Sequence, residues 1–464
     1  MSDVSGRLIA DKGQDAITIH LVDKKTGPAW IERQPAARKA LLEAMRFDPK
    51  KGYSHAILPT GKESGFTVLA AVADVEKLSP WCLAKLGDVL PEGTYRLAEG
   101  SPGIAALGWL LAQHRFTRFK SKSVERGARN LIVADAARID DIIRQAEATI
   151  LVRDLIDTPP ADMGPHELEE AVRDLAKAHH ADIEVIKGDA LDEGYPLIAA
   201  VGNAATRERR PRLIELHWGK ADDPRIAIIG KGVCFDSGGL DIKPSAGMRL
   251  MKKDMGGAAH AIALAKLIMG ARLPVRLHLL IPAVENSVDA ASFRPSDVVR
   301  SRKGLTVEID NTDAEGRLIL ADALTKAEEK EPELVIDYAT LTGAARVALG
   351  PDLPATFCDD DALMDTLAAC GREVDDPIWR LPLWDGYDDM LKSSVADLVN
   401  SAGSPFAGAI TAGLFLRRFA PEGAQWIHFD TFGWRPSAKP GRPKGGEALG
   451  LRAAYHMLRT RYSQ

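Results

Sequence analysis

The stretch RIAIIGKGVCFDSGG, residues 225–239, decides the fold of the larger part of the chain. It opens with an apolar, β-branched run of the kind found in strands that are buried on both faces, and it continues into a glycine-rich turn. Comparable runs lie at residues 197–202, 213–218, 275–284, 305–310 and 333–339. Helical patterns separate several of them, at residues 256–270 and 317–330. This alternation predicts an α/β fold with a mostly parallel central sheet covered by helices.

The first part of the chain has a pattern of its own. Strand-like runs at 17–21 and 66–72 and helical patterns at 36–46 and 103–114 predict a small α/β domain. A charged helical segment follows at about 136–157, and the adjacent Pro159 and Pro160 end it, because proline cannot continue a helix. We therefore expect an N-terminal domain over residues 1–140 without a catalytic motif, a catalytic domain over 141–464, and a linker helix at about 136–157.

The charge balance and the lack of targeting signals exclude several classes of protein. The 60 basic and 65 acidic side chains give a net charge of −5, which disfavours nucleic acid as the main partner. The N-terminus lacks the basic and apolar regions of a signal peptide, and no apolar run approaches the roughly 20 residues that span a bilayer. The four cysteines are scattered and form no CxxC pair. These features predict a cytoplasmic protein with no membrane partner.

Charged residues gather in two segments that each follow a predicted strand. In parallel sheets the ligand site lies beyond the carboxyl ends of the strands, so both segments are expected at the same edge. The two segments, 231–254 and 311–317, contain these candidates: Lys231, Asp236, Lys243, Asp254, Asp313, Glu315 and Arg317. Hard divalent cations prefer oxygen ligands, and four carboxylates balance the charge of two such cations. Without a cation, acids this close together would repel one another strongly.

Local backbone features support this convergence. Glycines flank each acidic residue, and they permit the tight turns that bring several ligands to one point. Asp313 and Glu315 are two residues apart, so in an extended segment they face the same side. Arg317 begins a predicted helix, where a cation is disfavoured by the helix dipole, and this favours a small bound anion at the guanidinium.

The motifs of both segments resemble those of the leucyl aminopeptidase family. NTDAEGRL (311–318) is similar to the family signature, and GKGVCFDSGGLDIKP (230–244) with MKKDMGGAAH (251–260) is similar to its other metal-binding region. TLTGA (340–344) and SPFAGAITAGLF (404–415) also resemble the family, and the similarity covers roughly residues 145–464. The resemblance implies a cytoplasmic metallo-exopeptidase, a hydrolase that removes the N-terminal residue from peptides and assembles as a homohexamer.

The resemblance also implies a role for each motif residue. One metal would be bound by Lys231, Asp236, Asp254 and Glu315, and a second, exchangeable metal by Asp236, Asp313 and Glu315. Lys243 would contact the scissile carbonyl, and Arg317 would hold a bicarbonate ion that acts as the general base. The substrate cleft would be lined by Met251, Asn311, Ala314, Thr340, Leu341 and Gly343. The implied cofactors are two divalent ions, Mn²⁺ or Zn²⁺ with Mg²⁺ possible, together with bicarbonate.

Elementary chemistry agrees with these roles. A lysine ligates a metal only as the neutral amine, and an adjacent dication lowers its pKa enough to allow this. A water between two metals becomes a nucleophile near neutral pH. None of the residues assigned a metal or catalytic role is a histidine, so the general base must come from elsewhere. A substrate whose free amine binds a metal explains exopeptidase action, since an internal peptide bond offers no such amine.

Some alternatives remain open at this stage. A two-metal phosphatase or nuclease would use a similar set of carboxylates, and a DNA-binding regulator would need a basic groove. The run IHFDTFGW (427–434) departs from the His-Leu-Asp-Ile-Ala-Gly type run of many family members, which affects the expected packing and pocket shape. Cys234 and His260 lie within the motifs, but we expect a buried apolar role for the first and a structural role for the second.

Overall fold

The computed structural model describes residues 4–61, 65–122 and 126–463. Two compact units make up the chain: residues 1–150 with 437–444, and residues 151–436 with 445–464. The helix expected at 136–157 is present as a 3₁₀ turn, Ala136–Arg138, followed by α5 (Ile139–Asp157). Helix α5 therefore contains the point at which the chain passes from the first unit to the second.

The first unit is built on a six-stranded sheet. Its strands follow the order β1 (Leu8–Ala10), β6 (Arg129–Val133), β5 (Gly93–Leu97), β2 (Ile17–Val22), β4 (Phe66–Ala71) and β3 (His55–Pro59). All neighbours are parallel except β3 and β4. Its helices are α1 (Gly27–Glu32), α2 (Ala36–Ala44), α3 (Ala84–Val89) and α4 (Ala105–Leu111). The strands and helices expected in this region are therefore confirmed.

The second unit is built on a nine-stranded sheet. Its strands follow the order β16 (Trp379–Arg380), β15 (Ala355–Phe357), β18 (Gln425–Asp430), β14 (Leu334–Ala339), β9 (Arg225–Gly230), β11 (Arg276–Asn286), β8 (Arg212–Trp218) and β7 (Asp182–Lys187), with β10 (Gly232–Asp236) beside the far end of β11. The central pairs are parallel, whereas β7, β8 and the β15–β18 pair run antiparallel. The expected α/β class with a mostly parallel sheet is confirmed.

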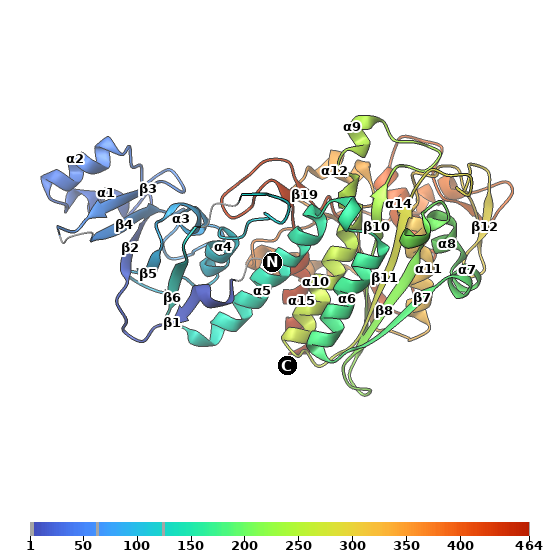
Figure 1. Ribbon diagram of the computed structural model, residues 1–464, viewed down its shortest axis with the longest axis horizontal. Coiled ribbons are helices and arrows are strands. Elements are labelled where there is room, and N and C mark those ends of the chain that lie inside the picture. The colour runs from blue at the N-terminus through green and yellow to red at the C-terminus, as the bar shows by residue number, and fades with distance from the viewer. Residues whose placement is uncertain (1–3, 62–64, 123–125, 464) are drawn as a thin grey trace. The chain divides into compact units, whose positions relative to one another are not determined.

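Helices cover both faces of this sheet (Figure 1). One face carries α6 (Pro165–His179), α10 (Gly256–Gly270) and α15 (Leu451–Tyr462), and the other carries α7 (Asp189–Gly194), α8 (Pro196–Gly202), α11 (Gly316–Glu328) and α14 (Gly408–Arg417). The remaining helices of this unit are α9 (Ser245–Met248), α12 (Gly343–Leu349) and α13 (Asp361–Glu373). Every residue of β14 is buried, as expected for a strand between two helical layers. The expected helices at 256–270 and 317–330 correspond to α10 and α11.

The prediction of a strand at residues 197–202 is wrong, because this segment lies within helix α8. A short apolar run has no period that separates a strand from a buried helix. Pro196 occupies the first helical position, where its fixed φ favours a helix. The carboxylate of Asp322 then accepts hydrogen bonds from the N–H groups of Leu197 and Ile198 at 2.9 and 3.4 Å. The side chain of Asp322, which is distant in the sequence, therefore satisfies N–H groups in the first turn of this helix.

The strand expected at 305–310 exists, but it is not part of the central sheet. Only β13 (Thr306–Glu308) is extended there, and it pairs with β12 (Val298–Arg300) and β17 (Leu398–Val399) in a separate three-stranded sheet. Val307 is fully buried, but the two residues on either side of it in β13 are only partly buried, unlike those of β14. A further two-stranded sheet joins β19 (Trp434–Arg435) and β20 (Gly445–Gly446).

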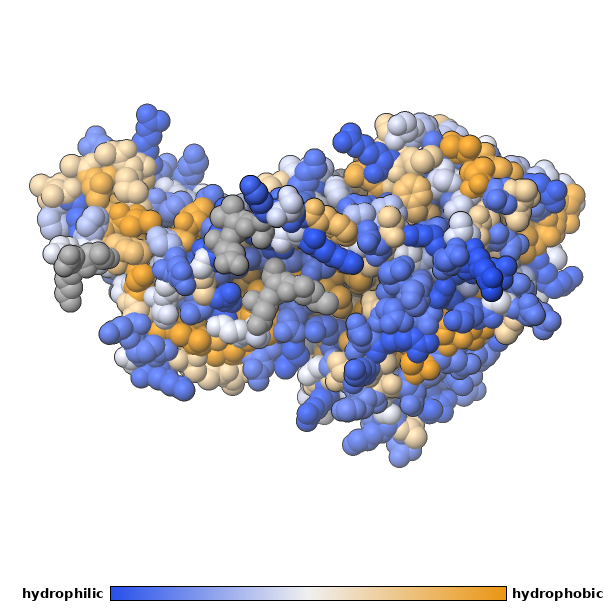
Figure 2. Space-filling model, in the orientation of Figure 1, coloured by the Kyte–Doolittle hydropathy of each residue, from blue (hydrophilic) through white to orange (hydrophobic). Residues whose placement is uncertain are grey.

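Hydrophilic and hydrophobic residues are interspersed over the face of the molecule seen in Figure 2. Among residues 4–61, 65–122 and 126–463, no helix has both the length and the apolar character needed to cross a bilayer.

Cys234 and His260, for which we expected a buried apolar role and a structural role, are both inside the protein. Cys234 is fully buried. His260 is also fully buried, and its ring bonds Gly256 O through Nδ1 and accepts the Leu449 N–H at Nε2.

Candidate active site

A cavity of about 490 Å³ lies in the second unit, at the carboxyl ends of β9, β10 and β14. The structure brings all of the sequence-predicted site residues to its wall. They are Lys231, Asp236, Lys243, Met251, Asp254, Asn311, Asp313, Ala314, Glu315, Arg317, Thr340, Leu341 and Gly343. This position is the one expected for a ligand site in a parallel sheet.

A larger cavity, of about 770 Å³, lies in the first unit. The ionisable residues on its wall are His20, Arg33, Glu76 and Glu99. This wall lacks the concentrated carboxylates of the smaller cavity. Chemistry rather than volume therefore directs attention to the smaller one.

Lys231 forms the centre of the buried half of the site. It follows β9, and its backbone N–H donates to the carbonyl of Tyr338, which holds it against β14. Its Nζ lies 2.6 Å from Asp254 Oδ2 and 2.8 Å from Glu315 Oε1. Gly316 makes room for this side chain, because a Cβ there would lie only 2.7 Å from both Cε and Nζ of Lys231. The position of the Lys231 side chain therefore requires a glycine at residue 316.

Lys243 forms the more open half of the site. Its Nζ lies 2.8 Å from Asp236 Oδ2, and it also forms an ion pair with Asp313. The loop that carries Lys243 turns at Gly238, which has a φ of +89°. A Cβ on Gly238 would lie 2.4 Å from the carbonyl oxygen of Asp241, so both the conformation and the space call for glycine.

The acid–base balance shows that the site is short of positive charge. Burial raises the pKa of Glu315, and the nearby charge of Asp236 adds to this rise. Burial and Asp236 likewise raise the pKa of Asp313. Burial acts in the same direction on Asp254, but the charges of Lys231 and Lys253 outweigh it and lower its pKa. Additional positive charge would therefore stabilise the ionised forms of Glu315 and Asp313.

The pKa values of Lys231 and Lys243 are raised by the surrounding carboxylates. Burial alone would lower the pKa of Lys231, but the carboxylates of Asp254 and Glu315 outweigh it and raise the pKa above its usual range. Burial is likewise outweighed at Lys243, mainly by Asp236, and its pKa is also raised. Each ammonium group therefore bridges two carboxylates that come from different segments of the chain.

Arg317 lies in the first turn of α11 and is almost fully buried. One guanidinium nitrogen donates to the carbonyl of Asn400 at 2.8 Å, whereas its Nε has no hydrogen-bond partner among the described residues. Burial lowers the pKa of Arg317 to about 10. The group remains charged at neutral pH, and Arg317 contributes to the cavity wall. Such a group suits a small anion.

Three residues that the sequence reasoning missed hold the site together. Asn286, at the end of β11, donates through Nδ2 to Asp236 Oδ1 at 2.9 Å and to the carbonyl of Thr312 at 3.1 Å. Asn400 accepts the N–H groups of residues 310 and 311 and donates to the carbonyl of residue 311. Lys253 places its Nζ 3.2 Å from Asp254 Oδ1. Lys253 stands inside a motif, but no pattern in the sequence distinguishes either asparagine.

The remaining wall of the cavity combines apolar, aromatic and polar side chains. Met251 and Leu341 contribute apolar side chains, and Thr340 donates through Oγ1 to Asp254 Oδ1 at 2.8 Å. Phe432, from the unusual 427–434 run, lies under Arg346, whose Cζ is 4.9 Å from the ring centroid. The departure from the family run thus places an aromatic ring at the cavity wall.

The arrangement has the donor set of a metal centre. One carboxylate oxygen each of Asp236, Asp313 and Glu315 lies within 4.8 Å of the others. Glu315 Oε2 is buried and has no hydrogen-bond partner among the described residues. Asp254 and Lys231 lie directly beside this group. A set of oxygen donors with one amine nitrogen suits divalent cations such as Mn²⁺, Mg²⁺ and Zn²⁺.

Comparison with known proteins bears on both units. The family described as cytosol aminopeptidase family, catalytic domain, matches residues 150–455, and the one described as M17 aminopeptidase, N-terminal domain, matches residues 17–132. A probable cytosol aminopeptidase from Syntrophotalea carbinolica is 40% identical over 366 residues, which cover 76% of this chain and 73% of that protein.

Solved structures agree over nearly the whole chain. The crystal structure of a cytosol aminopeptidase from Coxiella burnetii is 43% identical, with a TM-score of 0.92, and the match covers 98% of this chain and 99% of that one. The bottromycin maturation enzyme BotP in complex with Mn is 30% identical, with a TM-score of 0.86, and the match covers 96% of this chain and 100% of that one.

The fold and the site together define a metal-dependent aminopeptidase, a hydrolase of the exopeptidase type that acts on peptides. The chain belongs to the cytosol aminopeptidase family, M17, which confirms the resemblance seen in the sequence.

Proposed function

We propose that this aminopeptidase hydrolyses the N-terminal peptide bond with two divalent cations held by Lys231, Asp236, Asp254, Asp313 and Glu315. The observation that carries this proposal is the convergence of four carboxylates from two segments of the chain, 231–254 and 311–317, on one cavity. The buried, unpartnered oxygen of Glu315 supports it, because a buried carboxylate oxygen without a partner costs free energy unless a ligand satisfies it.

The donors divide into two sets that share Asp236 and Glu315. Lys231 and Asp254 complete the buried set, and Asp313, which is the most exposed of the acids, completes the open set. We assign the substrate's free amine to the buried set and the exchangeable cation to the open set. Mn²⁺ or Zn²⁺ fits both sets, with Mg²⁺ as a further candidate, and the Mn complex of BotP supports this choice.

Cations bound there supply an acidified water as nucleophile and polarise the scissile carbonyl. The chain's own residues orient the reaction. Lys243, at the open side, has its Nζ 2.8 Å from Asp236, which fixes the ammonium next to the metal ligands. From there it donates to the scissile carbonyl and stabilises the negative charge that develops on this oxygen.

Arg317 supplies the place for the general base. We propose that its guanidinium would hold bicarbonate, which would supply a general base for the nucleophilic water. The Nε of Arg317, buried and without a partner among the described residues, supports an anion at this position. The bond from Arg317 to the carbonyl of Asn400 fixes the plane of the guanidinium and so orients the anion.

The substrate lies in the remaining part of the cavity. We propose that it is lined by Met251, Asn311, Ala314, Thr340, Leu341 and Gly343, all of which lie on the cavity wall. Their mostly small or apolar side chains suit the side chain of the N-terminal residue. We propose further that residues 1–140 form an accessory domain joined by the helix at 136–157, that the chain assembles as a homohexamer, and that it acts in the cytoplasm, as the name cytosol aminopeptidase says of its relatives.

Hydrolysis of leucine amide and of N-acetyl-leucine amide, each with and without Mn²⁺, tests this function. The free amine binds the buried cation set, so only leucine amide should be hydrolysed, and chelation should abolish its hydrolysis. A phosphate ester such as p-nitrophenyl phosphate should not be hydrolysed with Mn²⁺. Equal rates for the free and the acetylated substrate would contradict the proposed role of the amine, and rapid phosphate ester hydrolysis would favour the phosphatase alternative.

A further inference from the structure

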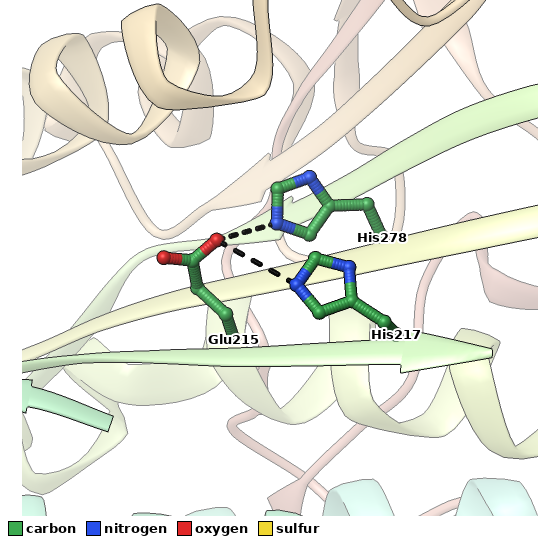
Figure 3. A group of neighbouring side chains, drawn as sticks. All are labelled: Glu215, His217 and His278. Atoms are coloured by element: carbon green, nitrogen blue, oxygen red, sulfur yellow. Dashed lines mark hydrogen bonds and ion pairs between the residues drawn. The ribbon is translucent and has the colours of Figure 1, made fainter. Parts of the chain in front are cut away.

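A second group of metal-ligating side chains lies in the central sheet, well away from the cavity. It consists of Glu215 and His217 on β8 and His278 on β11, which we call the His–Glu cluster (Figure 3). His278 Nε2 lies 2.7 Å from Glu215 Oε2, and His217 Nε2 lies 4.0 Å from the same oxygen. Figure 3 shows one ring nitrogen of each histidine facing the carboxylate of Glu215.

The geometry of the sheet produces the cluster. Glu215 and His217 are two residues apart on one strand, so their side chains share a face. His278 is the register partner of His217 on the antiparallel neighbour, which places it on that face too. The two rings stack, with 4.4 Å between their centroids and 25° between their planes. Pairing of the backbones therefore fixes the three side chains side by side.

The His–Glu cluster is remote from the site of the proposed chemistry. His278 stands near the beginning of β11, whereas Asn286, which contacts Asp236, stands at its end. Eight residues of extended chain span roughly 26 Å. The cluster thus lies at the amino end of the parallel strands, the opposite edge from the cavity.

A hydrogen-bonded Glu215–His278 pair alone does not account for the cluster. Glu215 and His278 are nearly inaccessible, yet Glu215 Oε1 and His278 Nδ1 have no hydrogen-bond partner among the described residues. His217, which is 36% exposed, faces the same carboxylate without a hydrogen bond to any described residue. A purely structural pair has no need of this second ring.

We propose that Glu215, His217 and His278 bind one Zn²⁺ ion, with water in the fourth position. Two imidazoles and one carboxylate form a known zinc ligand set, and the three ligand atoms lie within 4.8 Å of one another. Tetrahedral bonds of about 2.0–2.2 Å separate ligand atoms by roughly 3.4 Å, so small side-chain rotations bring the set to this geometry. The exposure of His217 gives water and the ion access to the site.

Burial, the largest cause, lowers the pKa of His217 to about 4, so its ring is neutral at neutral pH, the form that ligates metals. Burial favours the neutral form of Glu215, but the hydrogen bond and charge of a protonated His278 outweigh it and lower the pKa of Glu215. Zinc binding would replace the proton of His278 as the positive charge beside this carboxylate.

Neighbouring residues bring both positive and negative charge to the His–Glu cluster. Lys326 and Lys330 add positive charge near the cluster, but Lys326 is paired with Glu329 at 2.9 Å. On the adjoining strand β7, Asp182 and Glu184 are the register partners of His217 and Glu215. They add negative charge on the same face. The bound ion would link β8 to β11 across their antiparallel junction, so we assign it a stabilising rather than a catalytic role.

Zinc retention by wild-type protein and by matched histidine variants tests this proposal. Each protein is equilibrated with buffered Zn²⁺ in the presence of excess Mn²⁺, which competes for the oxygen-rich centre, and its zinc content is measured. His217→Gln and His278→Gln remove one ligand each. His456→Gln is the control, because His456 also bonds a glutamate at 2.7 Å (Glu373) but has no second histidine in a metal-ligating group.

Wild type and His456→Gln should hold one zinc per chain more than the two cluster variants. Zinc should also raise the unfolding temperature of the first two proteins more than that of the cluster variants. Glu215→Gln, which can keep the hydrogen bond to His278, should lose the same zinc without loss of the fold. Equal zinc content in folded wild type, His217→Gln and Glu215→Gln would overturn the proposal, as would zinc loss confined to a carboxylate-centre variant such as Asp313→Asn.

Discussion

Asn286 and Asp236 end neighbouring strands as register partners, and the side chain of the first donates to the second, with 2.9 Å between Nδ2 and Oδ1. The same amide nitrogen also donates to the carbonyl of Thr312, in the loop that carries Asp313. One side chain therefore sets the spacing between the two carboxylate-bearing segments. Because we propose Asp236 and Asp313 as metal ligands, we expect Asn286 to be needed for full metal affinity.

Asn286→Ala should lower kcat/KM and Mn²⁺ affinity by roughly 10- to 100-fold, the usual effect of removing such a partner. The loss follows because Asp236 can then rotate and the 311–317 loop is no longer tied to β11. Mn²⁺-dependent hydrolysis of leucine amide measures both effects. Asn203→Ala, at an exposed position, serves as the control and should behave as wild type. Wild-type Mn²⁺ affinity in Asn286→Ala would show that the bond is dispensable.

Gly316→Ala should reduce kcat/KM at least ~100-fold, since displacements of about 1 Å at a catalytic centre have effects of that size. The added methyl group would lie 2.7 Å from Lys231 Nζ and would force this side chain out of its place between Asp254 and Glu315. Gly403→Ala is the matched control, because nothing lies within 4 Å of a Cβ there. Steady-state kinetics of the two folded variants measure kcat/KM. Equal kcat/KM values for Gly316→Ala and Gly403→Ala would refute the steric role of Gly316.

Arg317→Ala should lower kcat by roughly 10²- to 10⁴-fold, the range expected for loss of a positioned general base. Wild-type activity should rise with added bicarbonate, whereas the variant should show no such response. Arg372→Ala, at an exposed site on α13, should keep both the activity and the response. The assay is hydrolysis of leucine amide over a range of bicarbonate concentrations. A normal bicarbonate response in Arg317→Ala would remove Arg317 from the proposed mechanism.

Asp322 should make the stability of the protein depend on pH. Burial raises the pKa of Asp322 to about 6, although the N–H groups of Arg302 and Leu197 counteract the rise. The usual value in unfolded chains is about 3.9. A raised pKa means that the folded chain binds this proton more tightly than the unfolded chain, so stability is greatest at low pH and is lost as pH rises through 6.

The difference in unfolding free energy between wild type and Asp322→Asn should therefore fall by roughly 2 kcal/mol from pH 4 to pH 7, since the shift is about two pKa units and the unfolded carboxyl is already about half ionised at pH 4. Urea unfolding at several pH values measures it. Asp365→Asn, at an exposed position, should give a flat difference over the same range. A flat profile for Asp322→Asn as well would mean that Asp322 titrates near its ordinary pKa.

The sequence predicted the parts of the structure whose chemistry is local. The helix at 256–270 coincides with α10, and the glycines of the 225–239 stretch include Gly238, at which the chain turns after β10 and Asp236. Candidate ligands could be recognised because Asp, Glu and Lys at strand ends have few structural explanations when they occur so close together. All of these residues lie on the cavity wall.

The features that the sequence did not predict depend on distant partners. Asn286 and Asn400 act on loops that are 26–90 residues away along the chain. The helix at 197–202 is capped by Asp322, 125 residues further on, so its apolar run alone could not distinguish helix from strand. The 305–310 segment pairs outside the central sheet with β17, which begins only at Leu398. Such pairings are properties of the folded chain and leave no pattern in a single segment.

The most direct test of the two-cation centre is recovery of activity after metal removal. Asp313→Asn is compared with Asp310→Asn, whose side chain is exposed three residues earlier in the same loop. Wild type and Asp310→Asn, stripped with a chelator, should be inactive on leucine amide and should recover as two equivalents of Mn²⁺ are added. Asp313→Asn should recover at least ~100-fold less activity, because loss of a cation removes several kcal/mol of transition-state stabilisation. Full activity of the stripped Asp313→Asn variant would contradict the two-cation mechanism.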